Sequence, residues 1–151
     1  MRRTFDESLQ DILQSMLSVC LEFIGEKADA VYLHCSVEEG MSSADVFFDI
    51  DGALRQTHEL DTADVGADTF DERLSSLLGC LLDDLDQLTE LHEGNRREPP
   101  TEMRLRYDVV PKNLSVSFSY ELKFSNTDTL LPSDIFDAWY EEVKSQRQTA
   151  A

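Results

Sequence analysis

Residues 44–60 read ADVFFDIDGALRQTHEL and contain the strongest structural signal in the chain. It opens with apolar and β-branched side chains, which favour a buried strand over 44–50. Asp51-Gly52 follows, and this dipeptide is a strong hairpin signal because both central positions of the tightest hairpin turns need a positive φ. A returning strand is therefore predicted over 53–60. Two strands joined by so short a turn must pair antiparallel.

Strand patterns continue on both sides of this hairpin. A strand is predicted over 30–37, and a polar loop over 38–43 leads from it to the next strand. Farther along, residues 102–124 alternate apolar and polar side chains on both sides of a Pro-Lys-Asn turn. This alternation predicts a second antiparallel hairpin with one apolar face and one solvated face.

Helical patterns fill the remaining segments. Apolar residues recur every three or four positions over 5–24 and over 70–92, and each of these runs opens with Thr-x-x-Glu, which predicts a capping box. A shorter apolar stripe, from Ile135 to Val143, predicts a last helix that Pro132 and Ser133 precede. We expect residues 144–151 to form a frayed tail.

The predicted order of elements is therefore α-βββ-α-ββ-α. Most strands follow one another directly, which excludes a parallel sheet with a helix between successive strands. We expect an α+β fold with a single antiparallel sheet of about five strands and helices packed mainly on one face. A length of 151 residues suits a single domain spanning 1–151.

Charge is the clearest functional signal. The chain has 31 acidic and 13 basic residues, a formal net charge of −18. Sixteen of the acids lie within residues 37–93, where the only bases are Arg55 and Arg73. Such a chain repels nucleic acid and anionic membranes, because binding either of them needs cationic surface on the protein. The charge therefore predicts a basic partner.

The cysteine spacing and the pattern of the first residues limit which class of protein we expect. Cys20, Cys35 and Cys80 lie far apart in apolar runs, which predicts buried free thiols and excludes a disulfide scaffold or a zinc ribbon. Acidic residues directly follow the basic residues of the N-terminus, so no secretory signal is predicted. No stretch is long and apolar enough to span a bilayer. We expect a cytoplasmic protein.

The motif search predicts no enzyme active site. No serine-hydrolase elbow, zinc-protease helix, dinucleotide-binding loop or P-loop occurs, and the three histidines lie in separate predicted elements. We therefore predict no catalytic residue, no metal and no cofactor.

One alternative comes from residues 46–54, which are similar to the first motif of haloacid-dehalogenase-like phosphatases. The resemblance implies that Asp49 is the nucleophile and Asp51 the general acid, with Mg²⁺ between them and a substrate phosphate. Ala53 stands where that motif has threonine, and a helix and a strand precede a motif that normally opens a parallel sheet. A hairpin turn is therefore the favoured interpretation.

The arrangement as a whole resembles the YezG-like immunity proteins, the antitoxins of LXG-type and related secreted nuclease toxins. The resemblance runs from about Phe5 to Val143. Its segments are Val31-Tyr32-Leu33, Asp45-Val46-Phe47-Phe48 with the Asp51-Gly52 turn, the Leu- and acid-rich helix, Met103–Asp108, Ser117–Tyr120, Leu131-Pro132-Ser133 and Trp139-Tyr140-Glu141. It implies a non-enzymatic inhibitor that binds a cognate bacterial toxin, typically a nuclease.

The resemblance and the charge together suggest where such a toxin would bind. We expect the contact surface in the acidic loop and the first turn of the following helix, with nearby acids beside it. The candidate residues are Asp61, Asp64, Asp68, Asp71 and Glu72, with Glu38, Glu39 and Asp49 as neighbours. Acids that only stabilise the helix dipole are the alternative for this segment. A homodimer, or an adaptor for a secreted effector, also fits the sequence.

Overall fold

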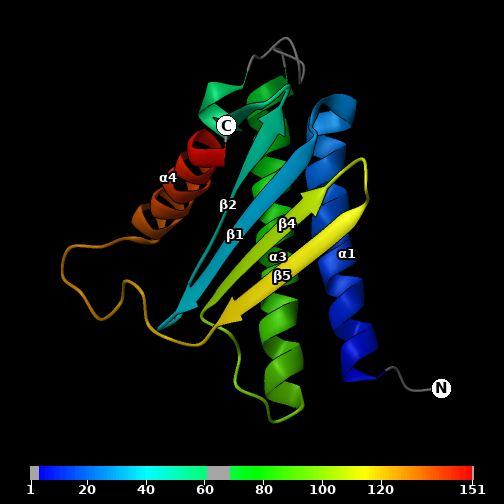
Figure 1. Cartoon of the computed structure of the whole chain (residues 1–151). Helices are drawn as coiled ribbons and strands as arrows, with labels where there is room; N and C mark the ends of the chain where they lie inside the picture. The colour runs from blue at the N-terminus through cyan, green and yellow to red at the C-terminus, as the bar shows by residue number, and fades with distance from the viewer. Residues whose placement is uncertain (1–3, 61–68, 151) are drawn as a thin grey trace.

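The structure is a computed structural model, and it describes residues 4–60 and 69–150 (Figure 1). These residues form an α+β fold with one five-stranded antiparallel sheet, and the order α-βββ-α-ββ-α is confirmed. The elements are α1 (Phe5–Ile24), η1 (Gly25–Lys27), β1 (Ala30–Glu38), β2 (Met41–Ile50), β3 (Ala53–Gln56), η2 (Thr57–Glu59), α3 (Phe70–Gly94), β4 (Glu102–Asp108), β5 (Asn113–Ser119) and α4 (Pro132–Ala150).

The strands lie in the order β3-β2-β1-β4-β5, so β1 is central and β3 and β5 form the edges. Every neighbouring pair is antiparallel. The predicted turn joins β2 to β3, with φ of 54° at Asp51 and 84° at Gly52. These positive values are the ones that a tight hairpin turn requires, so the decisive prediction is confirmed.

Helices α1 and α3 cover one face of the sheet (Figure 1). The period of two along β1 sends Val31, Leu33 and Cys35 into the core beneath these helices. From α3, the buried leucines Leu81 and Leu88 meet the same core. Burial of this continuous apolar layer is the main source of stability for such a fold.

Helix α4 covers part of the opposite face, over β1 and β2 (Figure 1). The rings of Tyr32 and Phe47 stack there with centroids 4.5 Å apart. Trp139 meets both rings edge-on, at 5.8 Å and 5.2 Å. The β4–β5 half of this face carries Ser115 and Ser117 exposed, as the predicted solvated face requires.

Several element boundaries differ from the predictions. The predicted loop 38–43 is only a tight turn at Glu39-Gly40, because both residues adopt positive φ. The strand 53–60 stops at Gln56, where η2 begins with its own capping box. The strand predicted to reach Phe124 ends at Ser119.

The remaining differences concern helix ends. The predicted frayed tail is wrong, since α4 continues to Ala150. Thr4 caps α1 by accepting a 3.1 Å hydrogen bond from the Glu7 amide, as predicted. Thr69 makes no such bond. Arg73 instead ties the first turn of α3 to the end of α1, donating to the carbonyls of Glu22 and Phe23 at 3.3 Å and 2.7 Å.

Candidate functional site

The exposed side of α3 carries a row of four carboxylates. Asp83, Asp86, Glu90 and Glu93 are spaced by three, four and three residues, so they lie on one face of the helix. All four are exposed, while the leucines on the opposite side of α3 enter the core. No ion pair in the described part of the chain involves them. We refer to these four residues as the acidic stripe.

The charge density of the acidic stripe approaches that of a nucleic acid. Ten residues of helix span about 15 Å, so the stripe carries about one negative charge per 5 Å of axis. A single strand of B-DNA carries one charge per about 3.4 Å of axis. The stripe therefore resembles a short phosphate backbone in sign and in linear spacing.

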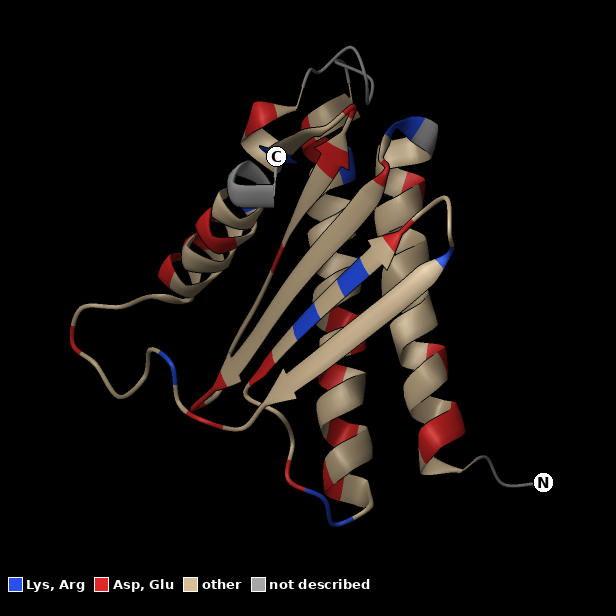
Figure 2. Cartoon of the chain, in the orientation of Figure 1, with Lys and Arg blue, Asp and Glu red and all other residues tan. Residues whose placement is uncertain are grey.

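Helix α1 extends this acidic surface. Asp6, Glu7, Asp11 and Glu22 are all exposed on it, and α1 contains no lysine or arginine. The only base in α3 is Arg73, whose guanidinium is bonded to backbone carbonyls of α1. Figure 2 shows acidic residues recurring along both helices, with basic residues on β4. The outer face of the helix layer therefore carries many exposed carboxylates.

The structure places two of the predicted contact residues on this surface. Asp71 and Glu72 are exposed in the first turn of α3, N-terminal to the acidic stripe on the same helix. Their position also suits the partial positive charge of a helix N-terminus. The predicted residues Asp61, Asp64 and Asp68 lie outside the described residues.

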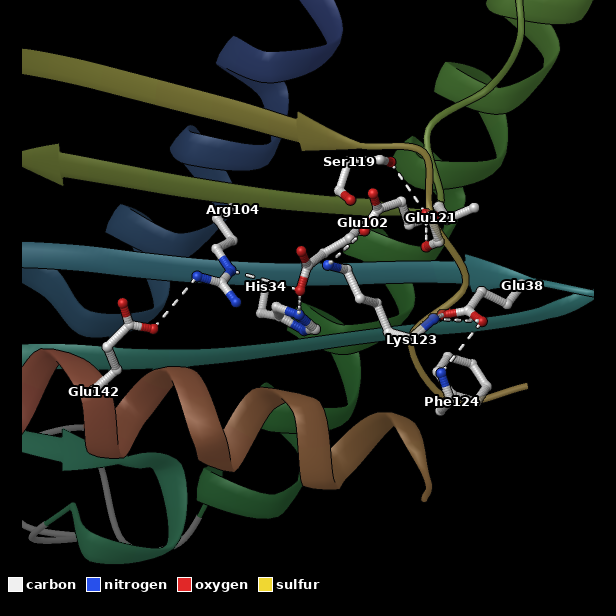
Figure 3. Close-up of polar contacts among 10 residues, drawn as sticks. His34, Glu38, Glu102, Arg104, Ser119, Glu121, Lys123, Phe124 and Glu142 are labelled. Atoms are coloured by element: carbon white, nitrogen blue, oxygen red, sulfur yellow. Dashed lines mark hydrogen bonds and ion pairs between the residues drawn. The ribbon is translucent and has the colours of Figure 1, made fainter. Parts of the chain in front are cut away.

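Glu38 is wrong as a surface contact. It is only 2% exposed, and its carboxylate accepts a hydrogen bond from the backbone amide of Lys123 at 3.0 Å (Figure 3). The backbone amide and the hydroxyl of Ser125 donate to the same carboxylate at 3.2 Å and 2.7 Å. Burial opposes ionisation here, but these bonds outweigh it and lower the pKa of Glu38. Glu38 therefore anchors the segment between β5 and α4.

The other two predicted neighbours are also separated from the contact surface. Asp49 is only 7% exposed, and its Oδ1 accepts a 3.1 Å bond from the Gly52 amide, so it supports the hairpin turn and is wrong as a surface contact. Glu39 is exposed, but it lies at the opposite end of β1. Glu39 and Asp49 are therefore separated by the length of β1, which is about 26 Å at about 3.3 Å per residue. The predicted residues therefore do not form one patch.

The phosphatase motif takes the geometry of a turn. Asp49 is the last residue but one of β2, and Asp51 occupies the hairpin turn that follows, where its amide donates to Asp29 Oδ2 at 3.2 Å. In the described residues, no three His, Cys, Asp or Glu side chains gather in a way that could hold a metal. These two carboxylates therefore act in this structure as parts of a hairpin.

A buried polar network under α4 is a feature that the sequence did not reveal. His34 Nε2 donates to Glu102 Oε2 at 2.9 Å, and Arg104 lies 3.5 Å from the same oxygen and 3.7 Å from Glu142 (Figure 3). Burial would raise the pKa of Glu102, but His34 and Arg104 lower it overall. The alternation of apolar and polar residues over 102–124 predicted that Glu102 faces solvent. The local sequence does not show that another part of the chain buries this end of β4.

Two of the three cysteine thiols are buried and one is exposed. Cys20 and Cys35 are buried as predicted, and burial raises the pKa of the Cys20 thiol to about 12. Cys80 is exposed on α3, so its predicted burial is wrong. All three thiols are free, in agreement with the absence of a disulfide scaffold.

Comparison with known proteins adds no assignment. A scan against protein-family models matched none of them, and a search of curated proteins found no relative. Across residues 4–60 and 69–150, no helix combines the length and apolar character that a membrane span requires.

Proposed function

We propose that this chain is an immunity protein that binds and neutralises a basic protein toxin, most simply a nuclease, inside the cell. The row of exposed carboxylates on α3, the acidic stripe, is the observation that supports this proposal. The resemblance to YezG-like immunity proteins, carried by the strand and turn segments, points to the same class. No turnover, metal or cofactor is needed for such a role.

The charge on the helix layer suits a nuclease as target. A nuclease must hold phosphates, so its cleft is cationic, and a row of carboxylates at similar spacing can occupy that cleft in place of the substrate. Opposite net charges also speed association, towards 10⁸–10⁹ M⁻¹s⁻¹ at low salt. Fast capture matters for an inhibitor that must act before its target damages nucleic acid.

The position of the acidic stripe favours a preorganised contact. The four carboxylates project from one regular helix whose apolar side is packed into the core, so the backbone beneath them is already ordered. A rigid element loses little conformational entropy when it binds. Asp71 and Glu72 extend the same surface towards the start of α3.

Charge reversal on the helix face tests the proposal. The protein is tagged and used at low salt to capture polypeptides from lysate of its own source cells, and the captured fraction is assayed for nuclease activity before and after release. We expect one basic nuclease, silent in the complex and active once released. The variant Asp83→Lys, Asp86→Lys, Glu90→Lys should bind it at least about a hundredfold more weakly, since close charge pairs across interfaces can each contribute more than 1.5 kcal/mol.

A matched control changes the same charge elsewhere. Glu121→Lys, Asp128→Lys, Glu141→Lys alters three exposed acids outside the helix layer and should keep most of the affinity. Equal losses in the two variants would mean that total charge, and not the helix face, determines binding. A bound nuclease that remains fully active would contradict inhibition and favour an adaptor. A reversal variant of Asp61, Asp64 and Asp68 then measures what that loop adds.

A further inference from the structure

The two edges of the sheet differ in how they are protected. Exposed edge strands are usually kept short or supplied with charge or proline, because their free backbone groups can pair with another chain. β3 has only four residues, includes Arg55 and passes directly into η2. β5 has seven residues, Asn113–Ser119, and contains neither charge nor proline. Among the described residues, no strand pairs with the outer edge of β5.

We propose that β5 pairs with β5 of a second copy of this chain, so that two sheets join edge to edge into one continuous ten-stranded sheet. The inference is independent of the proposed toxin binding, which concerns the helix face. It assigns a partner to the edge that the fold leaves open.

Charge selects a second copy as the partner. The hairpin from Glu102 to Ser119 contains three bases and two acids, so it is close to neutral in a chain whose net charge is −18. A basic partner is attracted to the acidic helices and not to this edge. Two copies meeting at β5 bring together two nearly neutral hairpins, so these strands add little like-charge repulsion of their own.

The order of residues along β5 suits a two-fold axis through Val116. Antiparallel pairing about that residue sets Leu114 opposite Phe118 and Ser115 opposite Ser117. Apolar side chains then meet apolar ones over the core face, and hydroxyls meet hydroxyls on the solvated face, both of which are favourable cross-strand pairs.

Exposed apolar residues at both ends of β5 support the same geometry. Val110, in the turn before β5, is 85% exposed, and Tyr120 and Leu122, just after it, are 48% and 44% exposed. The two-fold arrangement brings the turn of one copy beside the segment that follows β5 in the other. These side chains would then cover one another, whereas in a single copy they face water.

The oligomeric state and its response to edge variants test this pairing. Sedimentation equilibrium of the full chain should show a species of twice the 17.2 kDa chain mass. The exposed-site variant Ser115→Lys, Ser117→Lys sets like charges opposite each other and should weaken the dimer at least about tenfold. Ser75→Lys, Ser42→Lys adds the same charge at exposed positions on α3 and β2, away from β5, and should leave the dimer unchanged.

A charge-swap experiment makes the test specific to β5 against β5. Mixing the double-lysine variant with Ser115→Asp, Ser117→Asp should restore a dimer that contains one chain of each kind. Added salt should strengthen the wild-type dimer, because it screens the repulsion between two acidic chains. A monomer at all concentrations and salts, or a dimer that ignores the β5 variants, would overturn the inference. So would a monomer whose β5 variants lose only toxin binding, since the edge would then serve the toxin.

Discussion

The carboxylates of this protein occupy two contrasting regions. On the helix layer, the acidic stripe is exposed, repeated at helical spacing and without ion pairs in the described chain. On the opposite side of the sheet, Glu38 and Glu102 are buried and bonded to several donors. The difference shows that acidity alone does not mark a binding surface. Buried carboxylates hold segments of the fold together, and exposed ones that repel each other remain available to a partner.

The largest expected effect comes from breaking the buried network. Glu102→Ala removes the acceptor of His34 and the counter-charge of Arg104, so it should lower the free energy of unfolding by about 3–5 kcal/mol. Chemical denaturation measures the change. Glu121→Ala, at an exposed carboxylate nearby, should stay within about 0.5 kcal/mol of wild type. Equal changes in unfolding free energy in the two variants would show that the buried network stabilises the fold no more than an exposed carboxylate does.

A smaller loss is expected from the anchor of the segment between β5 and α4. Glu38→Gln keeps the size of the side chain but removes its charge, and should cost about 1.5–3 kcal/mol, the range for hydrogen bonds to charged groups. Hydrogen exchange of the Lys123 and Ser125 amides should speed up more than that of the strand amides. Unchanged protection at these two amides would contradict the anchoring role.

We expect the stability of the same variant to depend on pH differently from that of the wild type. The pKa of Glu38 is lower in the folded protein than its ordinary value, so its stabilising contribution is fully present above that ordinary pKa. It is lost as the pH falls through the folded pKa. Glu38→Gln should therefore lose less stability than wild type on acidification. Parallel stability curves for the two proteins in acid would contradict the lowered pKa.

The smallest expected effect is a gain in stability when charge is removed from the acidic stripe. The variant Asp83→Asn, Asp86→Asn, Glu90→Gln removes three neighbouring like-charge pairs of the acidic stripe, each worth about 0.2–0.5 kcal/mol. The free energy of unfolding should rise by about 0.6–1.5 kcal/mol at low salt, and the gain should shrink at high salt. Toxin binding should weaken in the same variant. A loss of stability would show that the stripe has stabilising contacts.

Local patterns predicted the fold because each strong signal acts over a few residues. Asp51-Gly52 needs only its own positive φ values, and the leucines of α3 repeat within one helix. The two threonine caps had the same sequence pattern, yet Thr4 forms its cap bond and Thr69, with φ of −124° and ψ of 10°, makes none. Signals that depend on distant segments are therefore less predictable.

The candidate site shows the same limit more strongly. Counting acids along the chain grouped Glu38 and Asp49 with the helix acids, although the fold buries both. The count also omitted the acids of α1, which share the helix layer with α3 but are far from it in sequence. Net charge suggested a basic partner without saying where it would bind, whereas packing shows which carboxylates are exposed and which are buried.

Trp139 gives this molecule an internal spectroscopic probe, because it is the one tryptophan of the chain. It sits between Tyr32, Phe47 and His34, so its indole reports on the docking of α4 and not on the helix layer. Its emission should shift to longer wavelength when α4 leaves the sheet and water reaches the ring. Fluorescence and far-ultraviolet dichroism should then follow one transition if the domain unfolds as a unit, and two if α4 detaches first.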